Sequence, residues 1–358
     1  MPHIRRDGAS ARVQPIIRSV ATGTPTPHRT PPEEQDHRFP NLLWCACSSF
    51  LTGIADKHAP LHVDNRTALT SAETECHTTN EFKSFFKSVD GNEGGKCKYP
   101  HRLDTYGRGC RHDCKYCYAK SLLDFRDLWD PNNPAVADIA KIERCVKRIA
   151  KDGEIKTVRM GGMTDCFQPD ERKYGVTYET IKLLNQYGIH YLIVTKSDMV
   201  AEDKYMAVMD KNLAHIQITV TTTDDELSTT YEKAPAPSKR IAAIEKLQAA
   251  GYDVALRLSS FIEQYIDFDI LNKVKCDKIL VEFLRANTWI RKWFDIDYSD
   301  YTISQHGYNH LPLDKKIKML SRVTGFKELT VCEDEDEAYE YWKANVNPNK
   351  EDCCNLRF

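Results

Sequence analysis

The sequence has 358 residues, enough for one large domain or for a domain with an extension. Its 50 basic and 52 acidic residues give a net charge of −2, so the overall charge does not mark nucleic acid as an obligatory partner, although a local basic groove stays compatible with one. The chain has no apolar run near the ~18 residues that span a membrane and no secretory signal at its start, so we expect a cytoplasmic protein without a membrane partner.

Residues 1–80 are rich in proline, threonine and serine and show no sustained helical or strand period. Their first 30 positions hold five arginines and one acidic residue, as in a transit peptide, but prolines interrupt any amphipathic helix there. We therefore expect a low-order, disordered extension. Within it, Cys45 and Cys47 form a C-x-C pair, for which incidental packing is a stronger interpretation than a metal site.

After the extension, short β-rich runs alternate with helical runs. The run 156–162 is followed by an amphipathic helix at 176–188. Further along, 238–251 predicts a helix with Ser238 as its N-cap and Gly251 at its end. Repeated β-then-α units with short connections predict parallel strands, in a (β/α) barrel or a doubly wound sheet. In a barrel, the chemistry belongs at the carboxyl ends of the strands.

The stretch "YGRGCRHDCKYCYAK" contains three cysteines within eight residues, Cys110, Cys114 and Cys117. In a reducing compartment such thiols remain available for a metal or for catalysis. A structural zinc site needs four ligands and usually a second C-x-x-C, which is not nearby, although His112 or Cys97 would complete one. A [4Fe–4S] cluster held by three thiolates instead leaves its fourth iron open for a ligand that must be activated. From the residues alone, both metal sites stay open.

The C-x3-C-x2-C spacing, with Tyr116 before the third cysteine and the loop between a short strand and a helix, resembles the radical S-adenosylmethionine (SAM) superfamily. This resemblance implies an α/β fold of the partial (β/α)6 TIM-like barrel type, with a [4Fe–4S] cluster on the three cysteines and SAM bound to the open iron. It also implies that the reduced cluster cleaves SAM and that the 5′-deoxyadenosyl radical abstracts a hydrogen atom from a substrate. A one-electron donor such as flavodoxin or ferredoxin is then a required partner.

Three further segments follow the second, third and fourth expected strands: "GGMTDCFQPDE", "LIVTKSD" and "TVTTTDDELSTTYEKAPAPSKRIAAIEKLQAAG". Together they resemble the spore photoproduct lyase-like group, also described as DNA repair photolyase-like, over about residues 95–290. The resemblance implies a radical SAM barrel at 81–290 and a C-terminal αβ extension at 291–358 that covers the barrel.

The resemblance also implies which side chains contact SAM. Tyr116 would lie beside the adenine, and Lys196 would meet the methionine carboxylate, for which a compact ammonium is suited. A surface lysine in a turn is the alternative for Lys196. In the fourth strand, Thr219 and Thr221 lie in a polar row with Gln217 and would hold the ribose. The ordinary preference of threonine for strands explains that row equally well.

The methionine amino group is assigned to the segment after the second strand. Gly161 and Gly162 resemble the glycine pair that lets the backbone approach this group. Many superfamily members place a glutamate next, whereas this chain has Met163. That departure leaves the amino contact to Thr164, Asp165 or backbone carbonyls.

Cys166 and Lys196 are the candidate catalytic residues. Spore photoproduct lyases place a cysteine just ahead of their T-S-D-like segment, and its thiol returns hydrogen to the product radical. That position is Gly162 here, while Cys166 lies beyond Asp165. Cys166 either takes over as hydrogen donor or packs as a small apolar residue. Repair of a thymine lesion therefore does not follow from radical generation alone.

Charged and aromatic residues in the last expected strands leave two interpretations open. Arg257 and Glu282 stand in otherwise apolar strands, so they either pair with each other or bind the substrate. The segment 289–301 gathers tryptophan, phenylalanine and tyrosine, which either stack on a base or pack as a lid or core.

Late in the chain, Cys332, Cys353 and Cys354 form a third group of cysteines. A second cluster or a zinc ion is one interpretation, but two adjacent thiols are poor ligands for a single metal ion. The sequence therefore indicates free thiols, unless Cys97 or Cys276 joins the group.

These patterns predict a radical SAM lyase that acts on a modified nucleobase, with a DNA lesion flipped into the barrel mouth as the leading substrate. One alternative is cleavage of a free 7-deazaguanine base, as by the queuine lyases of salvage. A repair enzyme calls for a basic groove, whereas a salvage enzyme calls for a closed pocket with one or two carboxylates. A third interpretation, from a different class, is a zinc-binding protein without catalytic activity.

Overall fold

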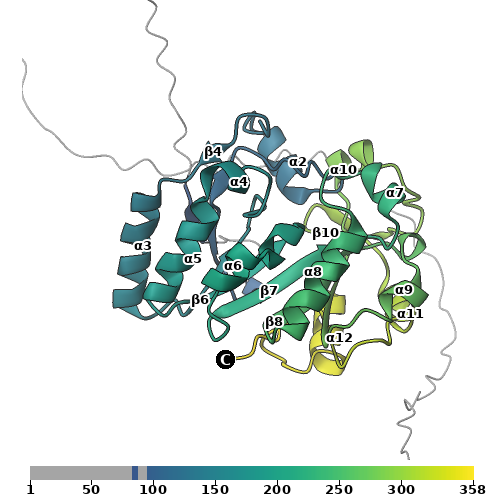
Figure 1. The fold of residues 1–358 in the computed structure, drawn as a ribbon. Coiled ribbons are helices and arrows are strands. Elements are labelled where there is room, and N and C mark those ends of the chain that lie inside the picture. The colour runs from purple at the N-terminus through teal and green to yellow at the C-terminus, as the bar shows by residue number, and fades with distance from the viewer. Residues whose placement is uncertain (1–82, 88–94) are drawn as a thin grey trace, which may run out of the picture. The chain divides into compact units, whose positions relative to one another are not determined.

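The computed structural model describes residues 83–87 and 95–358, and Figure 1 shows their arrangement. The predicted extension at 1–80, with Cys45 and Cys47, lies outside the described residues. None of the described helices combines the length and the apolar character needed to cross a membrane.

The centre of the fold is an eight-stranded sheet in the order β1-β2-β5-β6-β7-β8-β9-β12. Strand β1 is antiparallel to β2, and the other seven strands are parallel. Their bounds are Phe85–Lys87 (β1), His101–Leu103 (β2), Thr157–Met160 (β5), His190–Thr195 (β6), Ala214–Val220 (β7), Asp253–Phe261 (β8), Lys278–Phe283 (β9) and Glu328–Val331 (β12). The predicted α/β fold of the partial-barrel type is confirmed.

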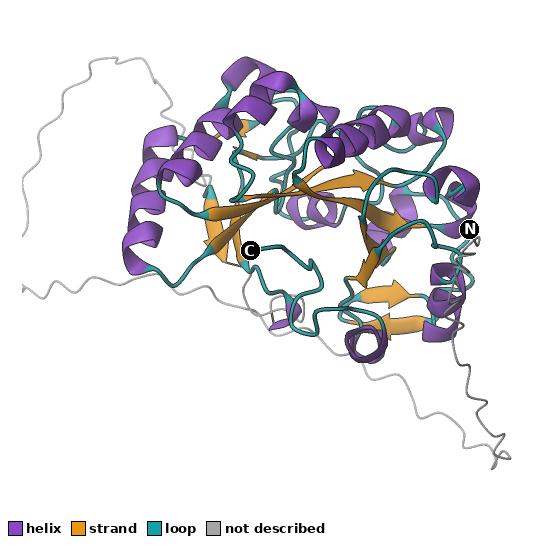
Figure 2. Ribbon diagram, turned by 60° about the horizontal axis from the view of Figure 1, so that its bottom comes forward, coloured by secondary structure: helices purple, strands orange, loops and turns teal. Residues whose placement is uncertain are grey.

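Helices follow most of the parallel strands, as the alternating sequence pattern predicts. Their bounds are Tyr118–Asp124 (α2), Ile139–Asp152 (α3), Glu171–Tyr174 (α4), Val176–Gln186 (α5), Asp203–Val208 (α6), Asp225–Thr229 (α7), Pro237–Ala249 (α8), Phe268–Leu271 (α9), Thr288–Trp293 (α10), Leu313–Leu320 (α11) and Asp336–Asn345 (α12). Figure 2 shows most of these helices on one side of the strands and the segment that leads to the C-terminus on the other.

Short elements complete the fold around the sheet. Two strand pairs stand apart from it, β3 (Tyr106–Gly107) with β4 (Ala135–Val136), and β10 (Ile303–Gln305) with β11 (Tyr308–His310). Two 3-10 turns follow β6 and β8, η1 (Asp198–Ala201) and η2 (Glu263–Tyr265).

The strands in the middle of the sheet are mostly buried, as is usual for parallel strands, whose two faces are both covered. All seven residues of β7 are buried, including the polar ones. Apolar side chains of β7 such as Ile216 and Ile218 belong to the main core, together with Ile244 and Leu247 of α8. The polar side chains of the same strand, Gln217 among them, therefore need partners inside the protein.

The start of α8 differs from the sequence prediction. Its N-cap is Ala236 and not Ser238, because Pro237 occupies the first helical position, where a missing N–H costs nothing. The Ser238 backbone N–H and hydroxyl instead both donate to the carboxylate of Asp225 in α7, at 2.9 and 2.5 Å. The helix ends at Ala249, just before Gly251 with its φ of +79°, as the sequence predicts.

Candidate functional site

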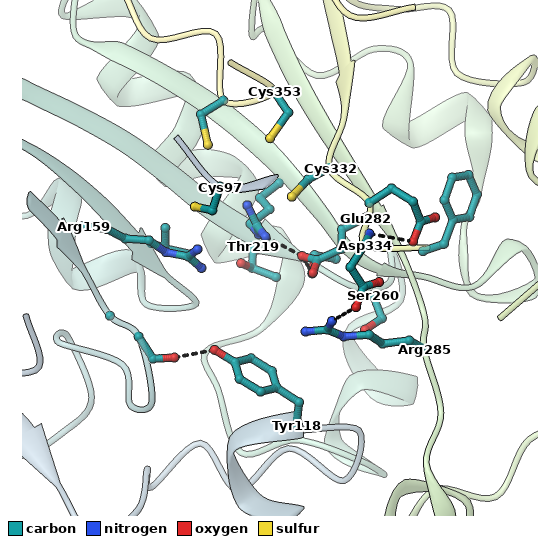
Figure 3. A pocket seen from close by; sticks show the side chains of 18 of the residues that line it. Cys97, Tyr118, Arg159, Thr219, Ser260, Glu282, Arg285, Cys332, Asp334 and Cys353 are labelled. Carbon is teal, nitrogen blue, oxygen red and sulfur yellow. Dashed lines mark hydrogen bonds and ion pairs between the residues drawn. The ribbon is translucent and has the colours of Figure 1, made fainter. Parts of the chain in front are cut away.

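A cavity of about 200 Å³ lies along the inner side of the sheet, at the carboxyl ends of the parallel strands. It is lined by residues within or just after strands β5, β6, β7, β8, β9 and β12, and by the loop with the three cysteines. Figure 3 shows its wall, in which the Tyr118 hydroxyl meets a backbone carbonyl and several cysteines point inward. The strand ends predicted to carry the chemistry thus face one space.

The three-cysteine loop is held in place by backbone contacts on both sides. Within the loop, the Asp113 amide donates to the Cys110 carbonyl at 3.1 Å, and the Cys117 amide donates to the Cys114 carbonyl at 3.2 Å. The Lys115 amide donates to the Tyr231 carbonyl at 2.9 Å, which ties the loop to the segment after α7. Cys117 is the N-cap of α2. The loop is therefore a tight turn with its thiols on a fixed frame.

The three thiols are neighbours in a water-poor environment. Burial raises the pKa of Cys110, of Cys117 and, most strongly, of Cys114, and each of these thiols lies close enough to another of the three to interact electrostatically. Cys114 and Cys117 line the cavity. Buried thiols of this kind stay protonated at neutral pH unless a metal binds, because metal binding releases the proton.

Behind the loop, Tyr116 belongs to a buried charged network. Its hydroxyl donates to the carboxylate of Glu232, which also pairs with the guanidinium of Arg240. Although burial acts to raise it, the nearby Arg240 charge holds the pKa of Glu232 below its usual value. The Tyr116 ring packs edge-on against Tyr231 and Phe294, with centroids 5.8 and 5.7 Å apart. The ring is therefore fixed in the cavity wall.

Lys196 follows β6 and extends into the cavity. Its ammonium lies 5.3 Å from the centroid of the Tyr116 ring, a distance that allows a cation–π contact. Within the part of the chain that the structure describes, this ammonium makes no hydrogen bond or ion pair, so it is available to an anionic ligand. The alternative of a surface lysine in a turn does not agree with this placement.

The glycine pair after β5 is fixed by Asp104, which follows β2. The Asp104 carboxylate accepts hydrogen bonds from the amides of Gly162 at 2.7 Å and Met163 at 3.0 Å. Burial raises the pKa of Asp104 to about 6 despite these bonds. Gly161 has φ of +84°, and a Cβ atom there would lie 2.6 Å from the Val194 carbonyl oxygen, so only glycine fits. Both glycines line the cavity.

Asp165 and Thr164 serve this backbone frame. The Asp165 carboxylate accepts from the Thr195 hydroxyl at 2.7 Å and from the Lys196 amide at 2.6 Å, so it fixes the backbone from which the Lys196 ammonium projects. The Thr164 hydroxyl donates to the Tyr106 carbonyl at 2.5 Å. Both side chains are committed to protein partners, and neither belongs to the cavity wall.

Besides Cys110, Thr164 and Asp165, two more predicted site residues do not line the cavity. Cys166 is fully buried in the core and does not line the cavity, which agrees with the packing interpretation rather than with a hydrogen donor. Thr221 follows β7, and its hydroxyl contacts Tyr231 and Glu232. Thr219 does line the cavity. Of the predicted ribose pair, the structure brings only Thr219 to the site.

The charges inside β8 and β9 pair with each other. The guanidinium of Arg257 bonds the carboxylate of Glu282 and, at 2.8 Å, the side-chain oxygen of Gln217. The Ser259 hydroxyl donates to Glu282 at 2.8 Å. Arg257 and Glu282 also line the cavity, so they can pair with each other and still contact a substrate.

Three residues of the site, Glu232, Asp104 and Tyr118, are not predicted from the sequence. Glu232 is separated from Cys114 by 118 residues, and nothing in its local sequence distinguishes it. Asp104 directly follows the short strand β2, and an acidic residue at the carboxyl end of a buried strand was a usable signal. Tyr118, whose hydroxyl donates to the Gly162 carbonyl at 2.5 Å, directly follows the third cysteine.

Comparisons with known proteins agree with this geometry. The family model of the radical SAM superfamily matches residues 105–263, from just before the three-cysteine loop to η2. Members of this superfamily use a [4Fe–4S] cluster and SAM. An uncharacterized protein of Mycobacterium tuberculosis (strain ATCC 25618 / H37Rv) is 28% identical over 177 residues, which cover 47% of this chain and 52% of that protein. An uncharacterized protein of Methanocaldococcus jannaschii is 24% identical over 165 residues, which cover 46% and 61%. The chain thus spans between half and two thirds of these relatives.

Solved structures with a similar fold include two of spore photoproduct lyase. A variant with bound AdoMet and dinucleoside spore photoproduct has a TM-score of 0.51 at 16% identity, covering 66% of this chain and 77% of that one. The enzyme complexed with dinucleoside spore photoproduct has a TM-score of 0.51 at 14% identity, covering 71% and 81%. At this level of identity the likeness is one of fold.

The residues of the site fit the cluster and SAM. Thiolates are the soft ligands that iron–sulfur clusters take, and three of them are close together and shielded here. An ammonium suited to a carboxylate stands on the same cavity wall. Zinc would need a fourth ligand, but the side chain of His112 is directed to Asp165, with Nε2 3.3 Å from the carboxylate.

Proposed function

We propose that this chain, whose residues 105–263 match the family model of the radical SAM superfamily, is a lyase that acts on a modified nucleobase in the cavity beside the three-cysteine loop. When bound, the cluster and SAM supply a 5′-deoxyadenosyl radical that abstracts a hydrogen atom from the substrate. The observation that carries this proposal is that Cys114, Cys117 and the Lys196 ammonium line one cavity.

In this proposal, the three-cysteine loop and β6 divide the binding of the two cofactors. Cys110, Cys114 and Cys117 are the cluster ligands, and the burial of Cys114 limits the access of water to the reaction centre. Lys196 binds the methionine carboxylate as a point charge. The Asp165 carboxylate, through the Lys196 amide, keeps this lysine in register with the loop.

The remaining SAM contacts fall on the cavity wall. Tyr116 offers an aromatic face for the adenine, and Thr219 offers a hydroxyl for the ribose. Gly161 and Gly162 offer close approach of the backbone to the methionine amino group. Thr164 and Asp165 act on SAM only indirectly, because their side chains are used to hold this backbone.

The charge of the cavity wall supports an anionic substrate. Six basic side chains and three carboxylates are among its described residues. The basic ones are Lys96, Lys98, Arg159, Lys196, Arg257 and Arg285, and the acidic ones are Glu282, Glu333 and Asp334. This positive excess suits a nucleotide with its phosphate better than an uncharged free base. A nucleic-acid lesion is therefore the proposed substrate class, with flavodoxin or ferredoxin as the class of electron donor.

A free 7-deazaguanine base is the alternative substrate. Glu282 on the cavity wall is the observation that favours it, because a carboxylate can accept from the edge of a base. Against it, that carboxylate already bonds Arg257 and Ser259.

The test is formation of 5′-deoxyadenosine, measured by mass spectrometry with anaerobically reconstituted, dithionite-reduced protein and SAM. Parallel samples contain a spore photoproduct dinucleotide with its phosphate, queuine, or no substrate. The proposal predicts an increase with the dinucleotide alone. An increase with queuine alone would move the substrate to the free base, and equal slow formation in all samples would reject both. No cleavage of SAM in any sample would contradict the radical enzyme itself and leave a zinc-binding protein as the alternative.

A further inference from the structure

A second group of thiols lines the same cavity as the three-cysteine loop. It consists of Cys97, which precedes β2, Cys332, which follows β12, and the adjacent pair Cys353 and Cys354 near the C-terminus. All four are free and half-buried. Figure 3 shows the side chains of Cys97, Cys332 and Cys353 near one another in one part of the pocket. We call these four residues the second thiol group.

The four thiols are mutual neighbours. The Cys353 thiol interacts with those of Cys332 and Cys354, and the Cys97 thiol lies close enough to Cys332 and Cys354 to interact electrostatically. The sequence left the late cysteines as free thiols unless Cys97 or Cys276 joined them. The structure brings in Cys97, while Cys276 packs in the core near β8 with its thiol directed to the backbone.

The spacing of these sulfurs does not suit a single zinc ion. Tetrahedral zinc with Zn–S bonds of about 2.3 Å requires its four sulfurs to be about 3.8 Å apart. Among the described residues, three ligand atoms within 4.8 Å of one another are found at His310, Glu333 and Asp334, and no three thiols of the second group are that compact. An iron–sulfur cluster binds each thiolate through a different iron atom, which allows a wider spacing and also allows adjacent cysteines to be ligands.

The group is supported by hydrogen bonds to the segments that carry it. The buried Asp352 carboxylate accepts from the Tyr99 hydroxyl at 2.6 Å and from the Cys354 amide at 2.9 Å, which joins the C-terminal turn to the Cys97 segment. Asn347 bonds the backbone of Val331 at 2.7 and 3.0 Å, next to Cys332. Three segments far apart in the chain are thus held around one point.

Positive charge surrounds the second thiol group. Arg159 lies close enough to Cys97 to interact electrostatically, and Arg159 and Arg257 both do so with Cys354. Four thiolates around an iron–sulfur cluster carry net negative charge, which guanidinium groups at close range stabilise. A disulfide would engage only two of the four thiols, whereas an iron–sulfur cluster takes all four as ligands.

We propose that Cys97, Cys332, Cys353 and Cys354 hold a second iron–sulfur cluster that faces the same cavity as the radical site. Because the second thiol group lines the same cavity of about 200 Å³ as Cys114 and Cys117, this cluster borders the substrate-binding space directly. The proposal does not depend on the first site, since the two groups share no ligand.

The test counts iron and acid-labile sulfide in anaerobically reconstituted full-length protein and in two variants. The first variant replaces Cys110, Cys114 and Cys117 with alanine, and the second replaces the four residues of the second thiol group with alanine. The proposal predicts that the first variant keeps about two to four iron and as many sulfide ions per chain, with a visible iron–sulfur absorption band. The wild type should exceed both variants in iron.

A single substitution outside the cysteines tests the same site with less risk that the variant fails to fold. Asp352→Ala removes the carboxylate that joins the C-terminal turn to Tyr99 but leaves every cysteine in place, and it should weaken iron retention by the second group about 10- to 100-fold toward a chelator. Glu351→Ala, at the exposed neighbouring position, is the matched control and should retain iron as the wild type does.

Two results would overturn the second cluster. One is a colourless first variant without iron, together with a second variant that holds as much iron as the wild type. The other is stoichiometric zinc, or a disulfide found by mass spectrometry, in place of iron in the first variant. Failure of the radical site looks different, because the second variant would then lack iron while the first variant retains it.

Discussion

Two groups of cysteines contribute side chains to one cavity, and the two groups are assembled in different ways. Cys110, Cys114 and Cys117 come from a single turn of eight residues, held by its own backbone. The second thiol group comes from three segments that meet only when β2, β12 and the C-terminal turn have folded together. A group made by one turn can be recognised from its spacing, whereas a group made by tertiary structure leaves no such pattern.

Removal of one ligand from the turn should have the largest effect. We expect Cys114→Ala to reduce formation of 5′-deoxyadenosine to the level of the buffer control. The cluster needs all three thiolates as ligands, and the two that remain do not retain it. Iron bound by the second thiol group should remain, so the iron content falls only in part. Cys145→Ala, which removes a thiol of α3 far from both groups in sequence, is the control and should keep full activity. Equal activity in both variants would contradict the assignment of the turn.

The buried charge behind the turn should show the next largest effect. Glu232→Gln leaves the fully buried Arg240 guanidinium without its counter-charge, which should lower the free energy of unfolding by about 3–5 kcal/mol. The exposed pair of Glu263 and Arg322 is the matched control, for which Glu263→Gln should cost less than about 1 kcal/mol. Thermal unfolding of both variants measures the difference. Similar losses in the two would show that the turn does not depend on this network.

The contribution of Asp104, which holds the glycine pair beside the turn, to the free energy of unfolding should depend on pH. The folded protein raises the pKa of Asp104 to about 6 from an ordinary value of 3.8, so the folded state binds the proton more tightly than the unfolded state. The stability from this group is therefore present below pH 4 and is lost as pH rises through 6, by about 3 kcal/mol in all. Asp104→Asn should abolish this dependence, so that the gap between wild-type and variant unfolding free energies shifts in the variant's favour from pH 4 to pH 7. If the difference in unfolding free energy between wild type and variant were the same at pH 4 and pH 7, the raised pKa of Asp104 would be contradicted.

Lys196 should show the smallest effect of the four. Lys196→Met removes a charged hydrogen bond to the SAM carboxylate, worth about 1.5–3 kcal/mol, and should raise the dissociation constant for SAM about 10- to 100-fold. Lys147→Met, on the exposed face of α3, is the control and should bind SAM as the wild type does. The binding is measured by equilibrium dialysis. If the Lys196 variant bound SAM with the dissociation constant of the wild type, Lys196 would not be a SAM contact.

The sequence predicted those features whose cause is local. Alternating strands and helices led to the partial barrel, and the spacing of Cys110, Cys114 and Cys117 led to the radical SAM superfamily. The predicted N-cap of α8 was wrong, because Pro237, one residue before Ser238, occupies the first helical position. Ser238 instead bonds Asp225. Local pattern thus decides element type better than element boundary.

What could not be predicted depends on contacts between distant segments. Glu232 reaches Tyr116 because the segment after α7 folds back onto the turn, and Cys97 reaches Cys332 because both flank strands of one sheet. For Cys166, the sequence allowed a hydrogen donor or a packed residue, and only its complete burial separates the two. Burial and long-range contact are properties of the whole fold.

The most direct test of the account is electron paramagnetic resonance of the reduced protein with and without SAM, in the variant that lacks the four residues of the second thiol group. This variant isolates the three-cysteine turn. The account predicts that SAM changes the spectrum of the remaining cluster, because SAM binds an iron that the three thiolates leave open, and that SAM leaves the spectrum unchanged in the variant lacking Cys110, Cys114 and Cys117. A cluster at the turn whose spectrum does not respond to SAM would contradict the central claim.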